Sequence, residues 1–369
     1  MPRSSGENRK MNGSRIATAV ICALFALLSA ASAASAQEIN SLSQLLGTDN
    51  GGYNAYVLGN IGSSTSAYTS DSQGAIAAGG NVYLNSFTVD TNGANAGTAI
   101  VTGGNLTLSN GTINGSADVG GNAALSASSV SGSVQAQGTV TTSNMSQPTT
   151  VTGSSAATPI NFTALATDTK NEAISIASLA QQAQTSGTAG SVSGTNNLTL
   201  TGTASGVNYF NLTAAQLSQL SSGSLTIDNT VAGATDIISV TGASVTVGAP
   251  GDFGFTYQGT ASATSTLFDF SQATSLSIAN AFDASILAPT ATVNFTNGNL
   301  TGILVAGNLA STPFQDGEFH AGTFSGTLPS IGASPAPAPL FGSSPLVGLI
   351  LAAVLALGLY RRRTSPVAP

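Results

Sequence analysis

Few side chains in this sequence could do acid–base or metal chemistry. The span 37–340 contains no arginine and no cysteine, a single lysine, Lys170, and a single histidine, His320. Glu318 precedes that histidine by two positions, so both side chains would face the same side of a strand. Two such groups are candidates for a metal site, but zinc takes three or four protein ligands, and a satisfied structural pair is the simpler interpretation. We expect Lys170 to be a solvated side chain on the polar face of a helix.

Carboxylates are the other candidates, because glycosidases use a pair of them. Asp252, Asp269 and Asp283 could supply such a pair, yet nothing in their spacing brings two of them together. The acidic residues also lack the D-x-D-x-D-G pattern of a calcium loop, and the recurrent Gly-Gly-Asn triplets lack the lysine of a phosphate loop. The sequence therefore shows no side chains placed to transfer a proton or to stabilise developing charge. We predict that the protein is not an enzyme and has no catalytic residue, cofactor or metal.

The charge balance excludes nucleic acid as a partner. Fourteen acidic residues and one lysine lie in the span 37–340, a net charge of −13 there, so nothing neutralises phosphates. Only 6% of the whole chain is charged, while 41% is apolar and glycine fills 43 positions. A disordered chain pairs low hydrophobicity with high net charge, and this composition instead favours a folded body with a core of small residues.

An internal repeat indicates how the candidate residues are positioned. Gly-Gly-Asn occurs at 79–81, 103–105 and 120–122, at steps of 24 and 17 residues. Shifting by 17 also superposes Leu108 on Leu125 and Ile113 on Val130, among others. At ~3.3 Å per residue, such a repeat forms one turn of short strands and corners, and these turns stack into a solenoid. We expect the 24-residue step to hold an excursion around Asp90–Gly93.

A helical segment separates this region from a second repeat. Residues 268–270 match 286–288 and 304–306 at a step of 18. Between the two regions, apolar residues from Asn161 to Ala183 follow three- and four-residue steps, with Asn161 as N-cap. Shorter helices are expected over 38–46 and 211–220. The prediction is one all-β domain, a β-solenoid (β-helix), with a single α-helix packed alongside.

The N-terminus is typical of a signal peptide. A basic stretch precedes the apolar run Ile16–Leu28, which is 13 residues long, and Ala34-Ser35-Ala36 gives an A-x-A cleavage site. The true start could be Met1 or Met11. Removal of residues 1–36 would leave an exported chain without cysteine and therefore without disulfides.

The C-terminus is typical of a membrane anchor or sorting tail. A Pro/Ala spacer over 333–340 precedes an apolar segment over 341–363 that ends in three arginines, and residues 364–369 follow. This pattern predicts a transmembrane helix with the arginines on the cytoplasmic side. We expect the solenoid domain over 37–332 to be exported, at least transiently membrane-anchored, and at the cell surface or outside the cell. A plain membrane tail and a tail cut by a processing protease both remain open.

Several motifs resemble the choice-of-anchor A family of bacterial surface proteins. They are Tyr53–Asn60, Gly74–Asn81, Phe268–Phe270, Ile286–Ala291, Glu318–His320 and Phe324–Gly326. Ala75 departs from the arginine expected in that family. The C-terminal spacer, helix and arginines resemble a PEP-CTERM sorting signal without its glutamate, and the helix beside the solenoid also resembles the bacterial ice-binding fold. The resemblance implies a β-solenoid at the cell surface and offers no catalytic residue.

Three functions are compared on these grounds. The favoured one is a structural or adhesive surface protein that binds an extracellular polysaccharide or another surface ligand. Ice binding would need a regular row of threonines, whereas the 17-residue step gives Thr107, Ala124 and Thr141, with Thr112 and Ser129 beside them. Because this row is broken, ice binding is disfavoured and is kept as the alternative. A polysaccharide-active solenoid enzyme is the least favoured, because the catalytic groups are absent.

Overall fold

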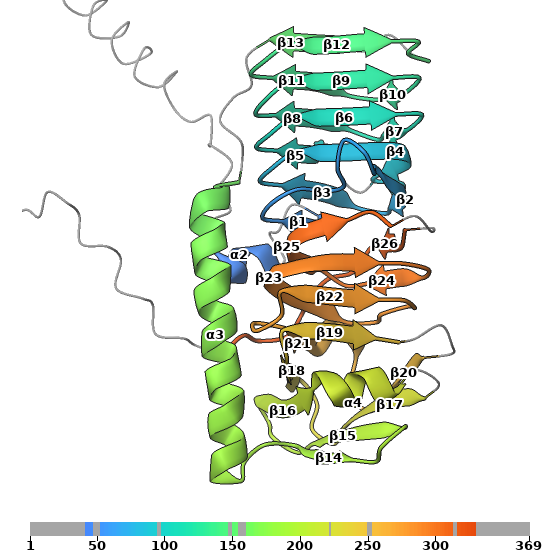
Figure 1. Ribbon diagram of the computed structural model, residues 1–369. Helices are drawn as coiled ribbons and strands as arrows, with labels where there is room; N and C mark the ends of the chain where they lie inside the picture. The colour runs from blue at the N-terminus through green and yellow to red at the C-terminus, as the bar shows by residue number, and fades with distance from the viewer. Residues whose placement is uncertain are drawn as a thin grey trace, which may run out of the picture. The chain divides into compact units, whose positions relative to one another are not determined.

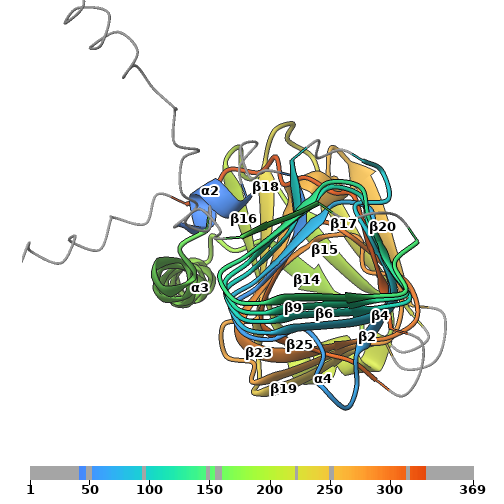
Figure 2. The same ribbon diagram turned by 90° about the horizontal axis from the view of Figure 1, so that it is seen from above.

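Short parallel strands stack rung upon rung into a β-solenoid that has a roughly triangular outline when it is seen end-on (Figure 2). The structure is a computed structural model that describes residues 41–46, 52–93, 97–146, 150–153, 160–220, 223–248, 253–312 and 316–329. Those up to Leu328 belong to one unit. The prediction of an all-β solenoid is therefore confirmed. The expected signal peptide (1–36) and C-terminal helix (341–363) lie outside the described residues, and no helix within the described ranges is long and apolar enough to cross a membrane.

The first half of the chain climbs from the middle of the solenoid to one end (Figure 1). Its strands alternate among three faces, which we name A, B and C. Face A holds β1 (Tyr53–Val57), β3 (Ala75–Ala78), β5 (Thr98–Thr102), β8 (Ser116–Val119), β11 (Ser133–Ala136) and β13 (Thr150–Gly153). Face B holds the start of β4 (Val82–Val89), with β6 (Leu106–Ser109), β9 (Ala123–Ser126) and β12 (Val140–Ser143). Face C holds β2 (Tyr68–Ser72), the end of β4, β7 (Thr112–Ile113) and β10 (Ser129–Val130).

Helix α3 (Phe162–Ser186) then runs back along the outside of the solenoid (Figure 1). The Asn161 side chain accepts a hydrogen bond from the Ala164 N–H at 3.0 Å, and Gly187 ends the helix with a left-handed φ of 72°. The helix buries one stripe of side chains, the spacing that predicted it: Leu165, Thr169, Ala173, Ile176, Ala180 and Ala183. This stripe packs on face A, and the short helix α2 (Leu42–Leu46) contacts α3.

The second half of the chain starts at the opposite end of the solenoid and climbs back to the middle. Face A continues with β16 (Val207–Thr213), β18 (Thr235–Thr241), β21 (Thr266–Asp269), β23 (Ser285–Phe295) and β25 (Leu304–Ala310). Face B has α4 (Ala214–Gln219), β19 (Ser244–Val247), β22 (Ser275–Ile278) and the ends of β23 and β25. Face C continues with β14 (Ser191–Ser193), β15 (Leu198–Gly202), β17 (Ser224–Asn229), β20 (Gly254–Gly259), β24 (Asn299–Thr301) and β26 (Glu318–His320), and the 3-10 helix η2 (Ala263–Ser265) follows β20.

The two halves meet at a seam in the middle of the ladder. There β1 pairs in parallel with β25, Ala55 opposite Leu304, and β2 pairs with β26, Ser72 opposite Phe319. The chain therefore forms one continuous stack although its order in the sequence is broken. The 211–220 prediction is partly wrong, because residues up to Thr213 belong to β16 and only α4 is helical.

The predicted repeats correspond to strand pairing. The step of 17 pairs Leu108 with Leu125 and Ile113 with Val130. The step of 18 sets Phe268 against Ile286, and Ile286 against Leu304. The 24-residue step has its extra residues between β4 and β5, where the sequence placed the excursion. Alternate side chains of each rung point inward and form a continuous apolar core.

The Gly-Gly-Asn triplets form the corners between faces A and B. The side chain of each of these asparagines, and of Asn60 and Asn308 at equivalent Gly-Asn corners, accepts a hydrogen bond from a backbone N–H of the next rung. The pairs are Asn308 with Asn60 (2.9 Å), Asn60 with Asn81 (2.7 Å), Asn81 with Asn105, Asn105 with Asn122 and Asn122 with Thr139 (2.8 Å each). We call this column the asparagine ladder. A Cβ on Gly121 would lie 2.4 Å from Asn105 Oδ1, so only glycine fits beside the ladder there. The ladder crosses the seam between Asn308 and Asn60.

Candidate functional site

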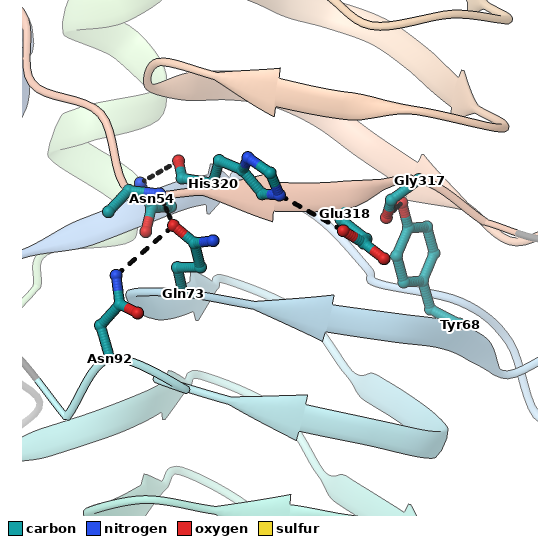
Figure 3. Close-up of polar contacts among 8 residues, drawn as sticks. Asn54, Tyr68, Gln73, Asn92, Gly317, Glu318 and His320 are labelled. Carbon is teal, nitrogen blue, oxygen red and sulfur yellow. Dashed lines mark hydrogen bonds and ion pairs between the residues drawn. The ribbon is translucent and has the colours of Figure 1, made fainter.

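The Glu318–His320 pair lies on the outside of face C at the seam (Figure 3). Phe319, between them on β26, is buried, so its two neighbours point outward together as their spacing predicted. The His320 Nε2 atom lies 3.3 Å from Glu318 Oε2, with the two side chains 29% and 37% exposed.

A third titratable residue, Asp71, joins this pair from β2. Because Ser72 is opposite Phe319, Asp71 is next to Glu318 across the seam. Burial and then the nearby Glu318 raise the pKa of Asp71, while His320 lowers it. The sequence analysis missed Asp71, because only the pairing of the two halves brings it near. The described residues contain no group of three or more His, Cys, Asp or Glu side chains placed to hold a metal ion.

The hydrogen bonds around the pair connect the two halves of the chain (Figure 3). The Asn54 side chain donates to the His320 carbonyl at 2.9 Å, and the Ala321 N–H donates to Gln73 Oε1 at 3.0 Å. Deeper in, the Tyr68 hydroxyl donates to the Gly317 carbonyl at 3.1 Å. All these contacts attach β26 and its flanks to β1 and β2, and they give this cluster a role in holding the seam.

The other candidate carboxylates lie apart from one another. Asp283 follows Phe282, which bridges to Leu300 on face C. Asp269 lies on face A between two core phenylalanines, so its side chain points outward toward α3. Asp252 lies outside the described residues. The structure therefore brings Asp269 and Asp283 to different faces.

Asp269 has an unusual environment. It is fully buried, and no hydrogen bond of normal length and angle reaches either carboxyl oxygen. Burial raises its pKa to about 8, although Ser271 and Ser239 lie close enough to oppose the change. The raised pKa favours the protonated form of this carboxyl group, which avoids the large cost of a buried unpaired charge.

A second buried carboxyl group, Asp236, has its hydrogen bonds satisfied. The side-chain amides of Asn208 and Asn229 donate to it at distances of 2.9 to 3.0 Å. Burial raises its pKa to about 6, and the two amides oppose that shift. This cluster supports the rung interior near β16–β18 and has no access for a ligand. Lys170 is exposed on α3, as expected.

The exposed rows of faces B and C carry small polar side chains. On face B, the row Tyr83, Thr107, Ala124, Thr141 lies beside a second row, Asn85, Ser109, Ser126, Ser143. On face C, Ser129 Oγ lies 3.2 Å from Thr112 Oγ1. The predicted 17-residue register is confirmed, but Thr112 and Ser129 lie on face C and not beside the row of Thr107 on face B. Ala124 and Tyr83 interrupt the threonines, so the upper rungs lack a regular threonine array.

These observations define a class: a β-solenoid with a helix alongside, dispersed titratable groups and broad exposed rows of hydroxyl and amide side chains. Residues 47–321, about three quarters of the chain, match the family described as "Putative Ice-binding-like adhesive domain". The chain belongs to this family of ice-binding-like adhesive domains. No curated protein and no solved structure matched in the corresponding comparisons. Membership supports a surface adhesive protein and a surface or extracellular location.

Proposed function

We propose that the protein is an exported adhesive of the bacterial cell surface that binds its ligand without transforming it. The family match over 47–321 carries this proposal. The polar outer rows of the solenoid support it, because hydroxyl and amide groups can both donate and accept hydrogen bonds. The net charge of −13 over 37–340 favours neutral or cationic surfaces as partners and disfavours nucleic acid.

The proposal includes the absence of catalysis. Of the candidate carboxylates, Asp269 and Asp283 lie on different faces, and the one imidazole of the described residues bonds its neighbour Glu318. Incubation of the purified protein with a panel of polysaccharides should release no reducing ends. Release that disappears in Asp269→Asn or Glu318→Gln would show that this part of the proposal is wrong.

Attachment through the C-terminus is the second part of the proposal. The spacer, the apolar segment and Arg361–Arg363 support a PEP-CTERM-like tail on a body of the choice-of-anchor A type. Cells should carry the body outside the cytoplasm, and changing the three arginines to alanine should alter retention or processing of the tail. Fractionation and intact-mass measurement test this, and a body found in the cytoplasm would refute export.

Adhesion itself is tested with cells that display the protein and with an isogenic strain that lacks it. Displaying cells should attach more strongly to a polysaccharide-coated surface under flow. Equal attachment of the two strains across neutral and cationic coatings would contradict the adhesive function.

Ice binding is the second candidate, because the family description names ice-binding-like domains and Thr107 and Thr141 lie in one outer row. Inhibition of ice recrystallisation by the wild type, lost in Thr107→Tyr with Thr141→Tyr, would favour it over adhesion. The interrupted row leads us to expect no inhibition.

A further inference from the structure

A groove runs between the C-terminal half of α3 and face A. It consists of two hollows of about 400 and 530 Å³ that share Gln181, Asn211 and Thr241 in their walls. Each volume falls in the range of about 300–1,000 Å³ that small-molecule sites occupy. Because the hollows share three residues, together they form one elongated site.

The lining of the groove is neutral and rich in hydrogen-bonding groups. None of the residues that line either hollow is charged, and most carry an amide or a hydroxyl. Such groups both donate and accept, as the hydroxyls of a sugar do. Ile174, at the rim, is the one large apolar side chain exposed among the described residues, at 59%. It offers an apolar patch for the C–H face of a sugar ring.

The two sides of the groove, helix α3 and strand β16 of face A, are held at a fixed distance. The Asn211 side chain donates to the Ala180 carbonyl of α3 at 2.8 Å and so ties the sheet to the helix. Asn211 is opposite Ser239 in the ladder, and Ser239 is opposite Asp269. A site held open in this way binds with little loss of conformational freedom.

Asp269 is a separate observation that points to this place. Its buried carboxyl group, which no hydrogen bond of normal length and angle reaches, is directed toward α3 between Ser239 and Ser271, and both of these serines line the groove. A buried polar group without a well-formed hydrogen bond costs stability, and Asp269 is such a group beside the groove.

We propose that this groove binds a neutral oligosaccharide, or a stretch of neutral polysaccharide, by amide and hydroxyl hydrogen bonds with Ile174 against a sugar face. The inference rests on the proposed adhesive function and names the site and the ligand class for it. Anionic polysaccharides are disfavoured because no cationic side chain lines the groove. Single-chain neutral glycans fit its elongated, open form.

The test is a titration of the full chain, in a sugar-free detergent, with neutral hexasaccharides of glucose and of N-acetylglucosamine and with an alginate hexamer. Isothermal titration calorimetry and ligand-observed NMR give the affinities. We expect at least one neutral hexasaccharide to bind and the alginate hexamer not to bind. Ser178→Trp should abolish binding by filling the first hollow, and Gln181→Ala should weaken it about tenfold, because it removes an amide shared by both hollows.

Gln182→Ala is the matched control, since Gln182 is exposed beside Gln181 but does not line the groove. It should leave the affinity unchanged, and circular dichroism should show the same fold in all variants. Binding of no neutral hexasaccharide, equal binding of the alginate hexamer, or unchanged affinity in a folded Ser178→Trp variant would each overturn the proposal. Cells that carry Ser178→Trp and still attach fully would likewise refute the groove, while the adhesive function would stand. Loss of attachment by these cells would support both.

Discussion

Buried carboxyl groups make the stability of this solenoid depend on pH. The pKa of Asp269 is raised to about 8 and that of Asp236 to about 6, in both cases chiefly by burial. Each folded-state pKa lies above the ordinary value near 3.8, so the folded chain holds protons that the unfolded chain releases. The stabilisation is fully present below about pH 4 and is lost as the pH rises toward 8.

We therefore predict that the free energy of unfolding decreases from pH 4 to pH 8. While the folded chain holds one extra proton, the decrease is ~1.4 kcal/mol per pH unit. Asp269→Asn keeps the shape of the side chain and should reduce this slope, most clearly between pH 6 and 8. Urea unfolding at several pH values measures it. A slope that is the same in wild type and Asp269→Asn would contradict the prediction.

At the scale of the element, each rung depends on an apolar interior, and the rungs from Asn308 to Asn122 also depend on a glycine–asparagine corner. Ile113 is fully buried inside the stack, while Thr112, its neighbour on β7, points outward. Ile113→Asp places an unpaired charge inside the rung, which costs several kcal/mol. It should lower the melting temperature sharply or prevent folding. Thr112→Asp, the control, should change stability by less than about 1 kcal/mol. Similar losses in both variants would argue against this assignment of inside and outside.

The asparagine ladder allows a second test. Asn105→Ala removes the acceptor of the Asn122 N–H and should cost about 1 kcal/mol. Gly121→Ala should cost more, because its Cβ would lie 2.4 Å from Asn105 Oδ1 and 2.9 Å from the Gly104 carbonyl oxygen. Gln137→Ala, exposed at a corner, is the control. Chemical denaturation gives the three values, and an Asn105→Ala cost equal to the control would remove the ladder as a source of stability.

Local patterns in the sequence predicted the elements well, because period and spacing are local properties. The steps of 17 and 18 matched the strand register, and the spacing of α3 matched its buried stripe. The seam was not predicted, since β1 and β25 carry no signal for pairing beyond the Gly-Asn corners at 59–60 and 307–308. The lack of a signal for pairing between distant segments also explains why the sequence analysis missed Asp71 and the groove. Both arise only when segments distant in the sequence lie side by side.

At the scale of the whole molecule, strands near the two ends of the sequence lie in the middle of the stack. β1 has hydrogen-bonded neighbours on both sides, β3 and β25. The ends of a chain usually fray, but a strand with two paired neighbours opens only when both ladders break. We predict that amide hydrogen exchange in β1 and β25 is slower than in β12 and β14. Exchange in β1 as fast as in β14 would mean that the seam is not formed in solution.

The seam also determines how the protein responds to mechanical tension. The chain leaves the body after Ser325 and Thr327, which hydrogen-bond to Thr264 and Thr235, and the strand before them, β26, lies between β24 and β2. A pull on residue 329 first breaks the contacts of Ser325 and Thr327 with Thr264 and Thr235, and it then acts on β26, in the middle of the stack and not on a terminal rung. A solenoid pulled from its last rung would unravel turn by turn at low force, whereas here two ladders must break together. In single-molecule pulling, the release of β26 should be one high-force event, and a staircase of small equal steps would contradict this. An adhesive built in this way could hold a cell against flow without lengthening.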